Sequence, residues 1–427
     1  MPGHKGRSFT GFEPVDITEF DGADNLFAPE GIILESERNA GELFGAETFY
    51  STEGSSLSIR AMLYLITFYA KCHGKRPVIA AGRNVHKTFV TAAALLDFDI
   101  VWLYPAEKSS YLSCELTADS MEKLFRDRPD VAAVYITSPD YLGNMQDNVT
   151  QLAEICHRNG AFLIVDNAHG AYLKFLSPSR HPIDCGADMC CDSAHKTLPV
   201  VTGGAYLHIS HKTDSFFAEN AKIALSLFAS TSPSYLILSS LDLANRYLEG
   251  HKKRLDGFVP MIEKYKNRLR KLGYTLIGNE PLKLTFDAKK YGYTGDELAQ
   301  ILIDNNLYSE FHDPDYLVLM VTPETGEDDL NRLYQALSRI EKRSEIAQKP
   351  PILTAKTAVM TPKEALFAPR ERVAVSRAEG RISADLTVSC PPAVPIVVCG
   401  EAINAKAVEC MKYYDVKSIW VVKQRTQ

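Results

Sequence analysis

The sequence lacks the features that would place the protein in a membrane, in a secretory route or on nucleic acid. Its 427 residues contain no run of about 18 apolar residues, so no membrane-spanning helix is expected. The charged N-terminus has no apolar segment behind it and does not resemble a secretory signal. A formal net charge of −6 and a pI near 6.0 argue against nucleic acid or an anionic membrane as the main partner.

Metal-type cysteine spacing is missing as well. The nine cysteines are an odd number, and no two of them form the C-x-x-C pair that often binds zinc. Cys190 and Cys191 are adjacent in an apolar segment and are expected to be buried thiols. The sequence therefore predicts no metal site and favours the cytoplasm, where thiols stay reduced.

Strand-like and helix-like segments alternate through the first half of the chain. Strands are predicted at 77–81, 99–104, 131–137, 161–165 and 205–209, and helices at 57–65, 90–96, 120–126 and 149–158. Strands separated by helices indicate βαβ units, so we expect a mainly parallel sheet that gathers ligands at the carboxyl ends of its strands.

The second half has a different pattern. One long helical region is expected from 234 to about 272, and its basic segment 251–254 is interpreted as a solvated helix face. A smaller α+β unit follows, with strands at 282–286 and 316–321 and helices beginning at 294–297 and spanning 327–340. Residues 342–351 are expected to form a linker. The predicted domains are 1–250 (major domain with the N-terminal segment), 251–345 (small α+β domain) and 346–427 (C-terminal segment).

Asp166 and Lys196 form the most informative pair of residues. The apolar run 161–165 ends in Asp166, and Lys196 follows in a small polar turn between His195 and Thr197. Pyridoxal 5'-phosphate (PLP) chemistry requires this combination. A lysine amine holds the aldehyde as a Schiff base, and an aspartate keeps the pyridine nitrogen protonated so that the ring accepts electrons. The sequence therefore predicts PLP as the cofactor.

Three His-Lys-Thr triplets compete for the Schiff base. Lys212 follows the predicted strand 205–209 in a polar segment and is expected in a surface loop. Lys87 has no carboxylate-bearing strand at a suitable distance before it. An isolated loop lysine is usually solvated surface. Only Lys196 combines an upstream carboxylate with small polar neighbours, so it is the predicted Schiff-base lysine.

Several ordered motifs together resemble the Orn/Lys/Arg decarboxylase family over nearly the whole chain. They are Met1-Pro2-Gly3-His4-Lys5-Gly6, Asp21-Gly22-Ala23-Asp24-Asn25-Leu26 with Pro29-Glu30-Gly31, Arg83-Asn84-Val85-His86-Lys87, Asp166-Asn167-Ala168-His169-Gly170, Ser193-Ala194-His195-Lys196-Thr197 and Thr231-Ser232-Pro233-Ser234-Tyr235. The resemblance is closest to the short Gram-positive arginine/lysine decarboxylases, which lack an N-terminal wing domain. It implies an α/β protein of PLP fold type I, with a mainly parallel, seven-stranded large domain between helices and a smaller α+β C-terminal part.

The resemblance also implies an activity. Members of the family decarboxylate arginine, lysine or ornithine to the polyamine-type amine and CO2, and they form homodimers or higher oligomers with shared active sites. The same core can support transamination, aldol cleavage or side-chain elimination, because the cofactor carries the chemistry. A catalytically idle homologue with a binding role is a further alternative.

The family motifs suggest roles around the cofactor ring. His86 resembles the histidine that stacks on the PLP ring, although a histidine beside an apolar helix is often only a structural hydrogen-bonding group. Ala168 is expected to pack against the ring. His169 is expected either near the PLP hydroxyl or in a strand-end turn. His195 or the released Lys196 is expected to be the general acid that protonates the α-carbon.

A phosphate cradle is expected where a loop enters the helix predicted at 57–65, because exposed N–H groups there bind anions. Gly54, Ser55 and Ser56 have the required composition, and an N-capping box is the structural alternative. The family usually has Asn where this chain has Glu53. The resemblance adds Ser193 and His195 as donors, and it implies that Thr231 and Ser232 reach the phosphate of a neighbouring subunit.

Three acids are candidates for binding the distal cation of the substrate: Asp140, Glu310 and Glu401. A loop-capping role is the alternative for Asp140. The tail from Ser389 to Pro395, with Glu401, resembles a family signature but lacks its Tyr and Gly. The N-terminal helix that precedes the Pro-Gly-His-Lys motif in the family is also expected to be missing.

Overall fold

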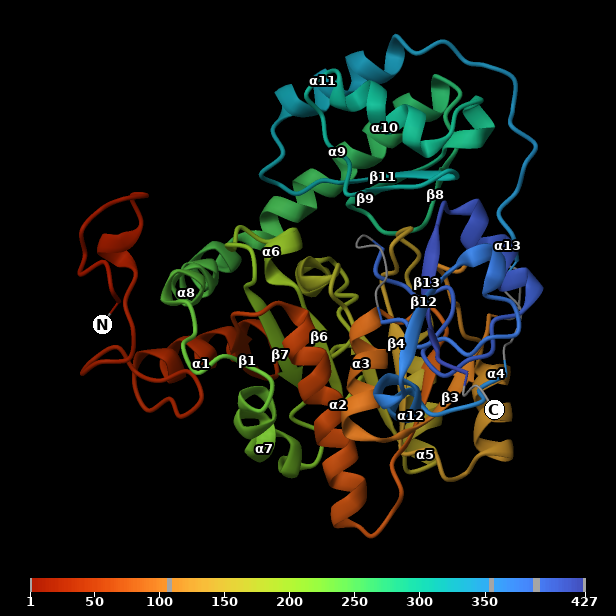
Figure 1. Cartoon of the computed structure of the whole chain (residues 1–427). Coiled ribbons are helices and arrows are strands. Elements are labelled where there is room, and N and C mark those ends of the chain that lie inside the picture. The colour runs from red at the N-terminus through yellow and green to blue at the C-terminus, as the bar shows by residue number, and fades with distance from the viewer. Residues whose placement is uncertain (1, 106–109, 353–356, 387–391, 425–427) are drawn as a thin grey trace. The chain divides into compact units, whose positions relative to one another are not determined.

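The central element of the fold is a seven-stranded sheet. The computed structural model describes residues 2–105, 110–352, 357–386 and 392–424. The strand order is β1-β7-β6-β5-β4-β2-β3 (Figure 1). The strands are β1 (Glu47–Ser51), β2 (Val78–Gly82), β3 (Asp99–Leu103), β4 (Ala133–Thr137), β5 (Phe162–Asp166), β6 (Met189–Asp192) and β7 (Ala205–Ile209).

The pairing of these strands positions the residues of interest. Strands β4, β5 and β6 are parallel neighbours, whereas β7 runs antiparallel to both β6 and β1. Asp166 is in register with Thr137 on one side and Cys191 on the other. Leu163, Ile164 and Val165 are fully buried, as expected for a strand covered on both faces. This hydrophobic run delivers the Asp166 carboxylate to the carboxyl end of the sheet, and the predicted α/β class is confirmed.

The helices predicted at 57–65, 90–96, 120–126 and 149–158 are confirmed with small shifts at their ends, except that α2 is considerably longer, whereas α1, α6 and α7 were not predicted. The helices of this part of the chain follow in order. They are α1 (Ile32–Phe44), α2 (Ser55–Cys72), α3 (Lys87–Leu96), α4 (Ala118–Asp127), α5 (Val149–Arg158), α6 (Ala194–Thr197), α7 (Ser215–Ser226) and α8 (Tyr235–Glu249), with 3-10 turns η1 (Glu13–Val15) and η2 (Ala171–Phe175). Helices α2 and α7 pack on one another and α2 also packs on β6 and β7, while α5 packs on β5.

The smaller α+β part contains an antiparallel sheet in the order β10-β11-β9-β8. Its elements are α9 (His251–Lys271), β8 (Leu276–Ile277), β9 (Lys283–Asp287), η3 (Ala288–Tyr291), α10 (Gly295–Ile303), β10 (Phe311–His312), β11 (Tyr316–Met320) and α11 (Glu327–Ser338). Thr294 and Glu297 form a reciprocal capping box at the start of α10, which fixes the predicted beginning of that helix.

The C-terminal part is built around a two-stranded sheet. Its elements are α12 (Pro362–Phe367), β12 (Arg370–Ala374), η4 (Val375–Arg377), α13 (Ala405–Tyr413) and β13 (Ser418–Val422), with β12 and β13 antiparallel. Buried side chains that include Val375, Ile403, Met411 and Val421 form its own hydrophobic core.

The helical region predicted from 234 to about 272 is confirmed, but two helices form it instead of one. Helix α8 ends at Glu249 and α9 begins at His251, with Gly250 between them. Glycine is among the poorest helix formers, which explains a break at this position. The solvated basic face is only partly present. Lys252 and Lys253 are exposed, but His251 is fully buried, and its ring packs on those of Phe175 and Tyr247.

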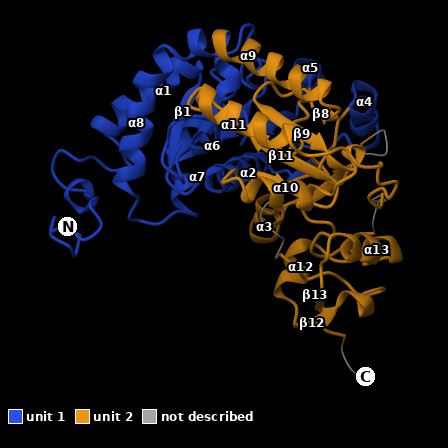
Figure 2. Ribbon diagram, turned by 90° about the horizontal axis from the view of Figure 1, so that it is seen from above, with its two compact units in different colours: residues 1–80, 117–138, 147–256 blue, residues 81–116, 139–146, 257–427 orange. Residues whose placement is uncertain are grey.

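The chain divides into two compact units (Figure 2). Unit 1 comprises residues 1–80, 117–138 and 147–256, and unit 2 comprises 81–116, 139–146 and 257–427. The division into domains at residues 250 and 345 stays a prediction. Among the described residues, none of the helices combines the length and apolar character that a membrane crossing requires.

Candidate cofactor site

Lys196 lies in unit 1, in the short helix α6 that follows strand β6. Its Nζ atom is 2.7 Å from the Nε2 atom of His169, which belongs to the turn after β5 and is 3% exposed. Strands β5 and β6 are parallel neighbours, so the turns that follow them meet at one edge of the sheet. The structure therefore brings together the predicted Schiff-base lysine and the predicted histidine of the β5 turn.

Asp166 ends strand β5 and is 3% exposed. Tyr135 donates its hydroxyl to Oδ2 at 2.9 Å, and the backbone N–H of Ala168 donates to Oδ1 at 3.2 Å. Burial raises the pKa of Asp166, while the bond from Tyr135, the N–H of Ala168 and the charge of Lys196 act in the opposite direction. A buried carboxyl with few internal partners is suited to bind one further proton-bearing group.

The predicted phosphate cradle lies at the N-terminus of α2. Gly54 is the N-cap, with a φ of 70° in the left-handed region that favours glycine, and no side chain caps the helix. The N-capping box expected as an alternative is therefore not formed. The hydroxyl of Ser193 donates to that of Ser55 at 2.8 Å, which joins two predicted donors. The N-terminus of an 18-residue helix without a side-chain cap suits an anion.

Glu53, which replaces the usual Asn of the family, has a structural partner. Its Oε1 accepts a hydrogen bond from the backbone N–H of Ser230 at 2.6 Å. This contact binds the carboxylate to the segment before α8. That segment carries Thr231 and Ser232, and both of them are exposed. Glu53 therefore links the loop before α2 to the loop that is predicted to contact the cofactor phosphate of a neighbouring subunit.

His195 is held by the backbone of Gly204. The backbone N–H of His195 donates to the Gly204 carbonyl at 3.2 Å, and the ring nitrogen Nδ1 lies 3.0 Å from the same oxygen. A carbonyl oxygen can only accept, so Nδ1 must carry the hydrogen in this contact. This arrangement fixes the ring plane and assigns a hydrogen to Nδ1.

His86 belongs to unit 2, where it is the N-cap of helix α3. Its Nδ1 accepts from the backbone N–H of Thr88 at 3.2 Å and lies 2.8 Å from the Thr88 hydroxyl. The structural alternative for His86 is therefore realised. The contact also fixes the direction of the imidazole ring, so it is compatible with the ring-stacking prediction.

Asp140 is also in unit 2 and is 4% exposed. Its Oδ1 accepts from the backbone N–H groups of Leu142 at 2.8 Å and Asn144 at 2.9 Å, and its Oδ2 accepts from the Asn144 side chain at 2.9 Å and from the Ser113 hydroxyl. These bonds match the loop-capping alternative. Burial raises the pKa of Asp140, and the hydrogen bonds from Ser113 and Asn144 oppose that effect.

The other two candidate acids differ in their surroundings. Glu401 is 2% exposed, and its Oε2 pairs with Nη2 of Arg83 at 3.0 Å, so it already has a cationic partner. Glu310 is partly exposed just before β10, and its backbone pairs with Val318. Among the described residues, no ion pair engages its carboxylate. Ser389 to Pro391 of the tail motif, like Met1, lies outside the described residues.

The competing lysines are placed as follows. Lys212 is exposed in the turn after β7, as predicted. Lys87 opens helix α3, and its backbone N–H donates to the Ala393 carbonyl at 2.7 Å. Cys190 and Cys191 are fully buried thiols, which confirms that interpretation.

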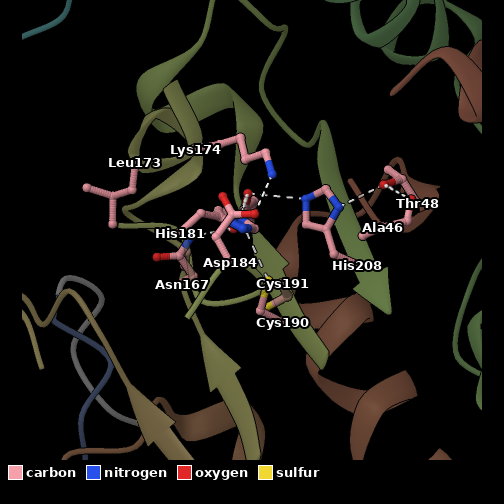
Figure 3. A network of polar contacts seen from close by, with 12 residues as sticks. Ala46, Thr48, Asn167, Leu173, Lys174, His181, Asp184, Cys190, Cys191 and His208 are labelled. Atoms are coloured by element: carbon pink, nitrogen blue, oxygen red, sulfur yellow. Dashed lines mark hydrogen bonds and ion pairs between the residues drawn. The ribbon is translucent and has the colours of Figure 1, made fainter. Parts of the chain in front are cut away.

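Sequence reasoning missed Tyr135 and Asp192. Tyr135 lies inside the apolar strand β4, where its register with Ile164 places it beside Asp166, and a tyrosine in a buried strand was the available signal. Asp192 ends β6 as Asp166 ends β5, so the same pattern of an apolar run closing in a carboxylate was present. Figure 3 shows part of the polar network around this second strand end.

The residues of unit 1 fit PLP. The amine of Lys196 can bind the aldehyde, and the buried carboxyl of Asp166 at the neighbouring strand end can bind the pyridine nitrogen. The N-terminus of α2, which no side chain caps, can bind the phosphate. Ala168 contributes a small side chain between Asp166 and His169.

Comparisons with known proteins show the family of this chain. The family profile "Orn/Lys/Arg decarboxylase, major domain" matches residues 12–277, and the profile of the C-terminal domain of the same family matches residues 345–421. The uncharacterized protein YaaO of Bacillus subtilis is 30% identical over 93% of this chain and 85% of its own length. The arginine decarboxylase of Bacillus subtilis is 28% identical over 95% of this chain and 87% of its own length.

Solved structures show the same fold. The lysine decarboxylase LdcF of Francisella novicida superposes with a TM-score of 0.80 at 16% identity, covering 99% of this chain and 78% of that one. The constitutive lysine decarboxylase of Escherichia coli gives a TM-score of 0.76 at 18% identity, covering 99% and 79%. With both family profiles matched in order, this chain belongs to the Orn/Lys/Arg decarboxylase family.

Proposed function

We propose that this protein is a PLP-dependent decarboxylase of a basic amino acid, namely arginine, lysine or ornithine, and releases the corresponding amine and CO2. The observation that carries the proposal is the arrangement of Lys196 with His169 at one strand end and of Asp166 at the same edge of the sheet. Family membership supports the reaction type, and relatives named arginine decarboxylase support the substrate class.

When bound, PLP supplies an electron sink that stabilises the negative charge left on the α-carbon as CO2 departs. Lys196 is the residue that would hold the cofactor aldehyde covalently. His169 Nε2, at 2.7 Å from Lys196 Nζ, can accept a proton from that amine, which keeps the amine nucleophilic.

Asp166 would hold the proton on the pyridine nitrogen. Its burial strengthens any ionic contact, because the local dielectric constant is low, and Tyr135 fixes the carboxyl plane. Ala168 would pack on the ring from the β5 turn. The role of His86 as the residue that stacks on the ring is part of the proposal and rests on the family motif.

The phosphate would be held by the N-terminus of α2, with Gly54, Ser55 and Ser56, and by Ser193 and His195 from the turn after β6. The hydrogen bond between Ser193 and Ser55 supports this grouping. Return of a proton to the α-carbon would fall to Lys196 or His195, and the contact with Gly204 fixes the ring plane of His195.

Glu310 is the strongest of the three candidates for binding the substrate's distal cation. Asp140 caps a loop with both carboxylate oxygens, and Glu401 is paired with Arg83. An acid that is already neutralised contributes little to binding a new cation. Glu310 is therefore the proposed carboxylate that binds the distal cation of the substrate.

The proposal includes a cytoplasmic homodimer, or a higher oligomer of dimers, that acts in polyamine formation. Thr231 and Ser232 would contribute to the cofactor phosphate of the neighbouring subunit, and their exposure supports this role. The eight cysteines of the described residues are free thiols, which supports a reducing compartment.

The decisive experiment is a product analysis. Purified protein loaded with PLP is incubated separately with arginine, lysine, ornithine and other common amino acids, and products are identified by mass spectrometry. The expected result is an amine shorter by CO2 from one basic amino acid. A keto acid, an aldol fragment or an elimination product would establish another PLP reaction, and the absence of any product would favour the idle-homologue alternative.

A further inference from the structure

Asp192 is a fully buried carboxylate at the end of β6, four residues before Lys196. Its Oδ2 contacts Nε2 of His181 at 3.1 Å and Nε2 of His208 at 3.2 Å. Figure 3 shows His208 and His181 converging, with His208 also reaching Thr48. The mechanism derived above assigns no role to this group.

The carboxylate of Asp192 stays ionised in this network. Burial alone would raise its pKa, but the contacts with His181 and His208 hold the pKa well below its ordinary range. Burial lowers the pKa of His208, which favours its neutral form. Lys174, Cys190, Cys191 and Tyr206 are further charged or titratable groups that interact with this network, and Asp184 acts on Cys190.

Asn167 connects this carboxylate to the strand that carries Asp166. Its side-chain Nδ2 donates to Oδ1 of Asp192 at 2.6 Å, and its backbone N–H donates to the Cys191 carbonyl at 3.0 Å. Hydrogen bonds to an ionised acceptor are shorter and stronger than neutral ones. The residue after Asp166 is thus tied, through side chain and backbone, to the segment that leads into Lys196.

We propose that Asp192 is a positioning residue that fixes Asp166 relative to Lys196 through its bond to Asn167. The inference rests on the proposed function, since it gives these two residues their common ligand. The two histidines bind Oδ2 of Asp192 and Asn167 binds Oδ1, so both carboxylate oxygens are held and the link from β5 to β6 is rigid. If Asp166 is misplaced relative to the pyridine nitrogen, turnover falls while substrate binding is not weakened.

A metal ion is the alternative explanation of the same cluster. His181, Cys190 and Asp192 offer ligand atoms within 4.8 Å of one another. However, the Nε2 of His181 is already hydrogen-bonded to Asp192, and burial raises the pKa of Cys190 well above its ordinary value, which opposes a thiolate. Metal analysis of the purified protein tests this alternative directly, and one bound transition-metal ion per chain would overturn the positioning role.

The test compares Asp192→Asn with a matched control on the same strand. Asp188 precedes β6 at its other end, is 7% exposed and accepts from Nε2 of His157 at 2.9 Å and from the Leu163 N–H at 2.7 Å. Asp188→Asn therefore removes a similar buried, histidine-paired carboxylate away from Lys196. For both variants, the pH titration of the visible absorbance of the PLP-loaded protein is measured, together with kcat and KM.

Asp192→Asn is expected to lower the apparent pKa of the absorbance change by about one unit or more, because a displaced Asp166 stabilises the positive charge of the loaded cofactor less. Its kcat should fall at least about tenfold with KM within about threefold of the wild type. Asp188→Asn should leave the titration and kcat near wild type. Equal effects in the two variants, or no effect in Asp192→Asn, would overturn the inference.

Asn167→Ala tests the link from its other side and remains informative if Asp192→Asn does not fold. It should reproduce the loss of kcat, and the double variant should be no worse than the more impaired single variant, because both changes break the same connection. Additive losses would overturn the proposal. A wild-type protein that shows the absorbance but decarboxylates nothing contradicts the proposed function alone, because the titration still tests the positioning role.

Discussion

The side-chain nitrogens of Lys196 and His169 lie 2.7 Å apart, a distance at which one nitrogen donates a hydrogen and the other accepts it. An ammonium can only donate, so a protonated Lys196 requires a neutral acceptor on His169. The sequence left His169 between a place near the cofactor hydroxyl and a role in the strand-end turn. The structure places it in direct contact with the amine of Lys196.

The first prediction concerns the attachment of the cofactor. Lys196→Ala should abolish the visible absorbance of the loaded protein and the PLP that borohydride fixes to the chain, because no other amine occupies this position. Peptide mapping of the reduced wild type should place PLP on Lys196. The exposed Lys212 provides the control, and Lys212→Ala should retain full labelling. Labelling of Lys87 or Lys212 in the wild type would refute the assignment.

A second prediction concerns the electron sink. Asp166→Asn should keep PLP bound but lower kcat by orders of magnitude, because an amide cannot stabilise a protonated pyridine nitrogen. Each lost pKa unit of that nitrogen corresponds to about 1.36 kcal/mol. Tyr135→Phe removes only the bond to Oδ2 and should reduce kcat by roughly tenfold or less. Steady-state kinetics and cofactor titration measure both variants. Near-normal turnover of Asp166→Asn would eliminate the proposed role.

Local patterns were sufficient to predict much of the fold and the chemical centre. The apolar run before Asp166 has no polar position on either face, and only a strand covered on both sides tolerates that pattern. The sequence did not predict the helix break at Gly250 or the burial of His251, because both depend on weaker signals. Gly250 ends a helix in a segment whose apolar periodicity continues on both sides, and the burial of His251 depends on the distant ring of Phe175 as well as on Tyr247, four residues before it.

Contacts between distant segments were beyond the reach of the sequence. Tyr135 meets Asp166 only because β4 and β5 pair in a particular register, and Glu53 meets Ser230 across a separation of 177 positions. No local propensity encodes either contact. The ion pair of Glu401 with Arg83 is also long-range, and it changes which acid can bind a substrate cation.

A third prediction links cofactor binding to assembly. If Ser232 completes the phosphate site of a neighbouring subunit, PLP binds the associated state more tightly, and dilution should release PLP as dimers separate. Ser232→Ala should weaken PLP affinity by several-fold while Lys196 remains reactive to borohydride trapping. Analytical ultracentrifugation with absorbance detection measures both the dissociation of the dimer and the PLP that stays bound. Ser226, an exposed residue at the end of α7, provides the control, and Ser226→Ala should change neither. Release of PLP without dissociation would contradict the shared site.

The fourth prediction separates the three candidate substrate acids. Glu310→Gln should raise KM for the preferred basic amino acid by about tenfold and leave the cofactor absorbance unchanged. Asp140→Asn and Glu401→Gln should instead lower stability, because each leaves hydrogen bonds or a buried cation without its partner. Kinetics and thermal unfolding distinguish the two outcomes. If Glu310→Gln has a normal KM and a stable variant of Asp140 or Glu401 has a raised KM, that other acid binds the substrate's cation.

The last prediction concerns pH and Asp313, which is 7% exposed. Its Oδ1 accepts from the N–H groups of Asp315 and Tyr316, both at 2.7 Å, while Oδ2 has no hydrogen-bond partner among the described residues. Burial, only partly offset by these N–H groups, raises the pKa of Asp313 from 3.8 to about 7. The folded state therefore keeps a proton on this carboxyl at pH values where the unfolded chain has lost it.

The contribution of protonated Asp313 to stability is consequently complete below about pH 4 and is lost as pH rises through about 7. Asp313→Asn cannot titrate, so the free energy of unfolding of the wild type should fall relative to this variant between pH 5 and 8, by at most roughly 2.7 kcal/mol, since about two units at about 1.36 kcal/mol each lie between pH 5 and the folded pKa. Urea unfolding at several pH values measures the difference. The exposed Asp304 provides the control, and Asp304→Asn should follow the wild-type pH dependence. A constant difference between wild type and Asp313→Asn across this range would show that Asp313 is ionised in the folded protein.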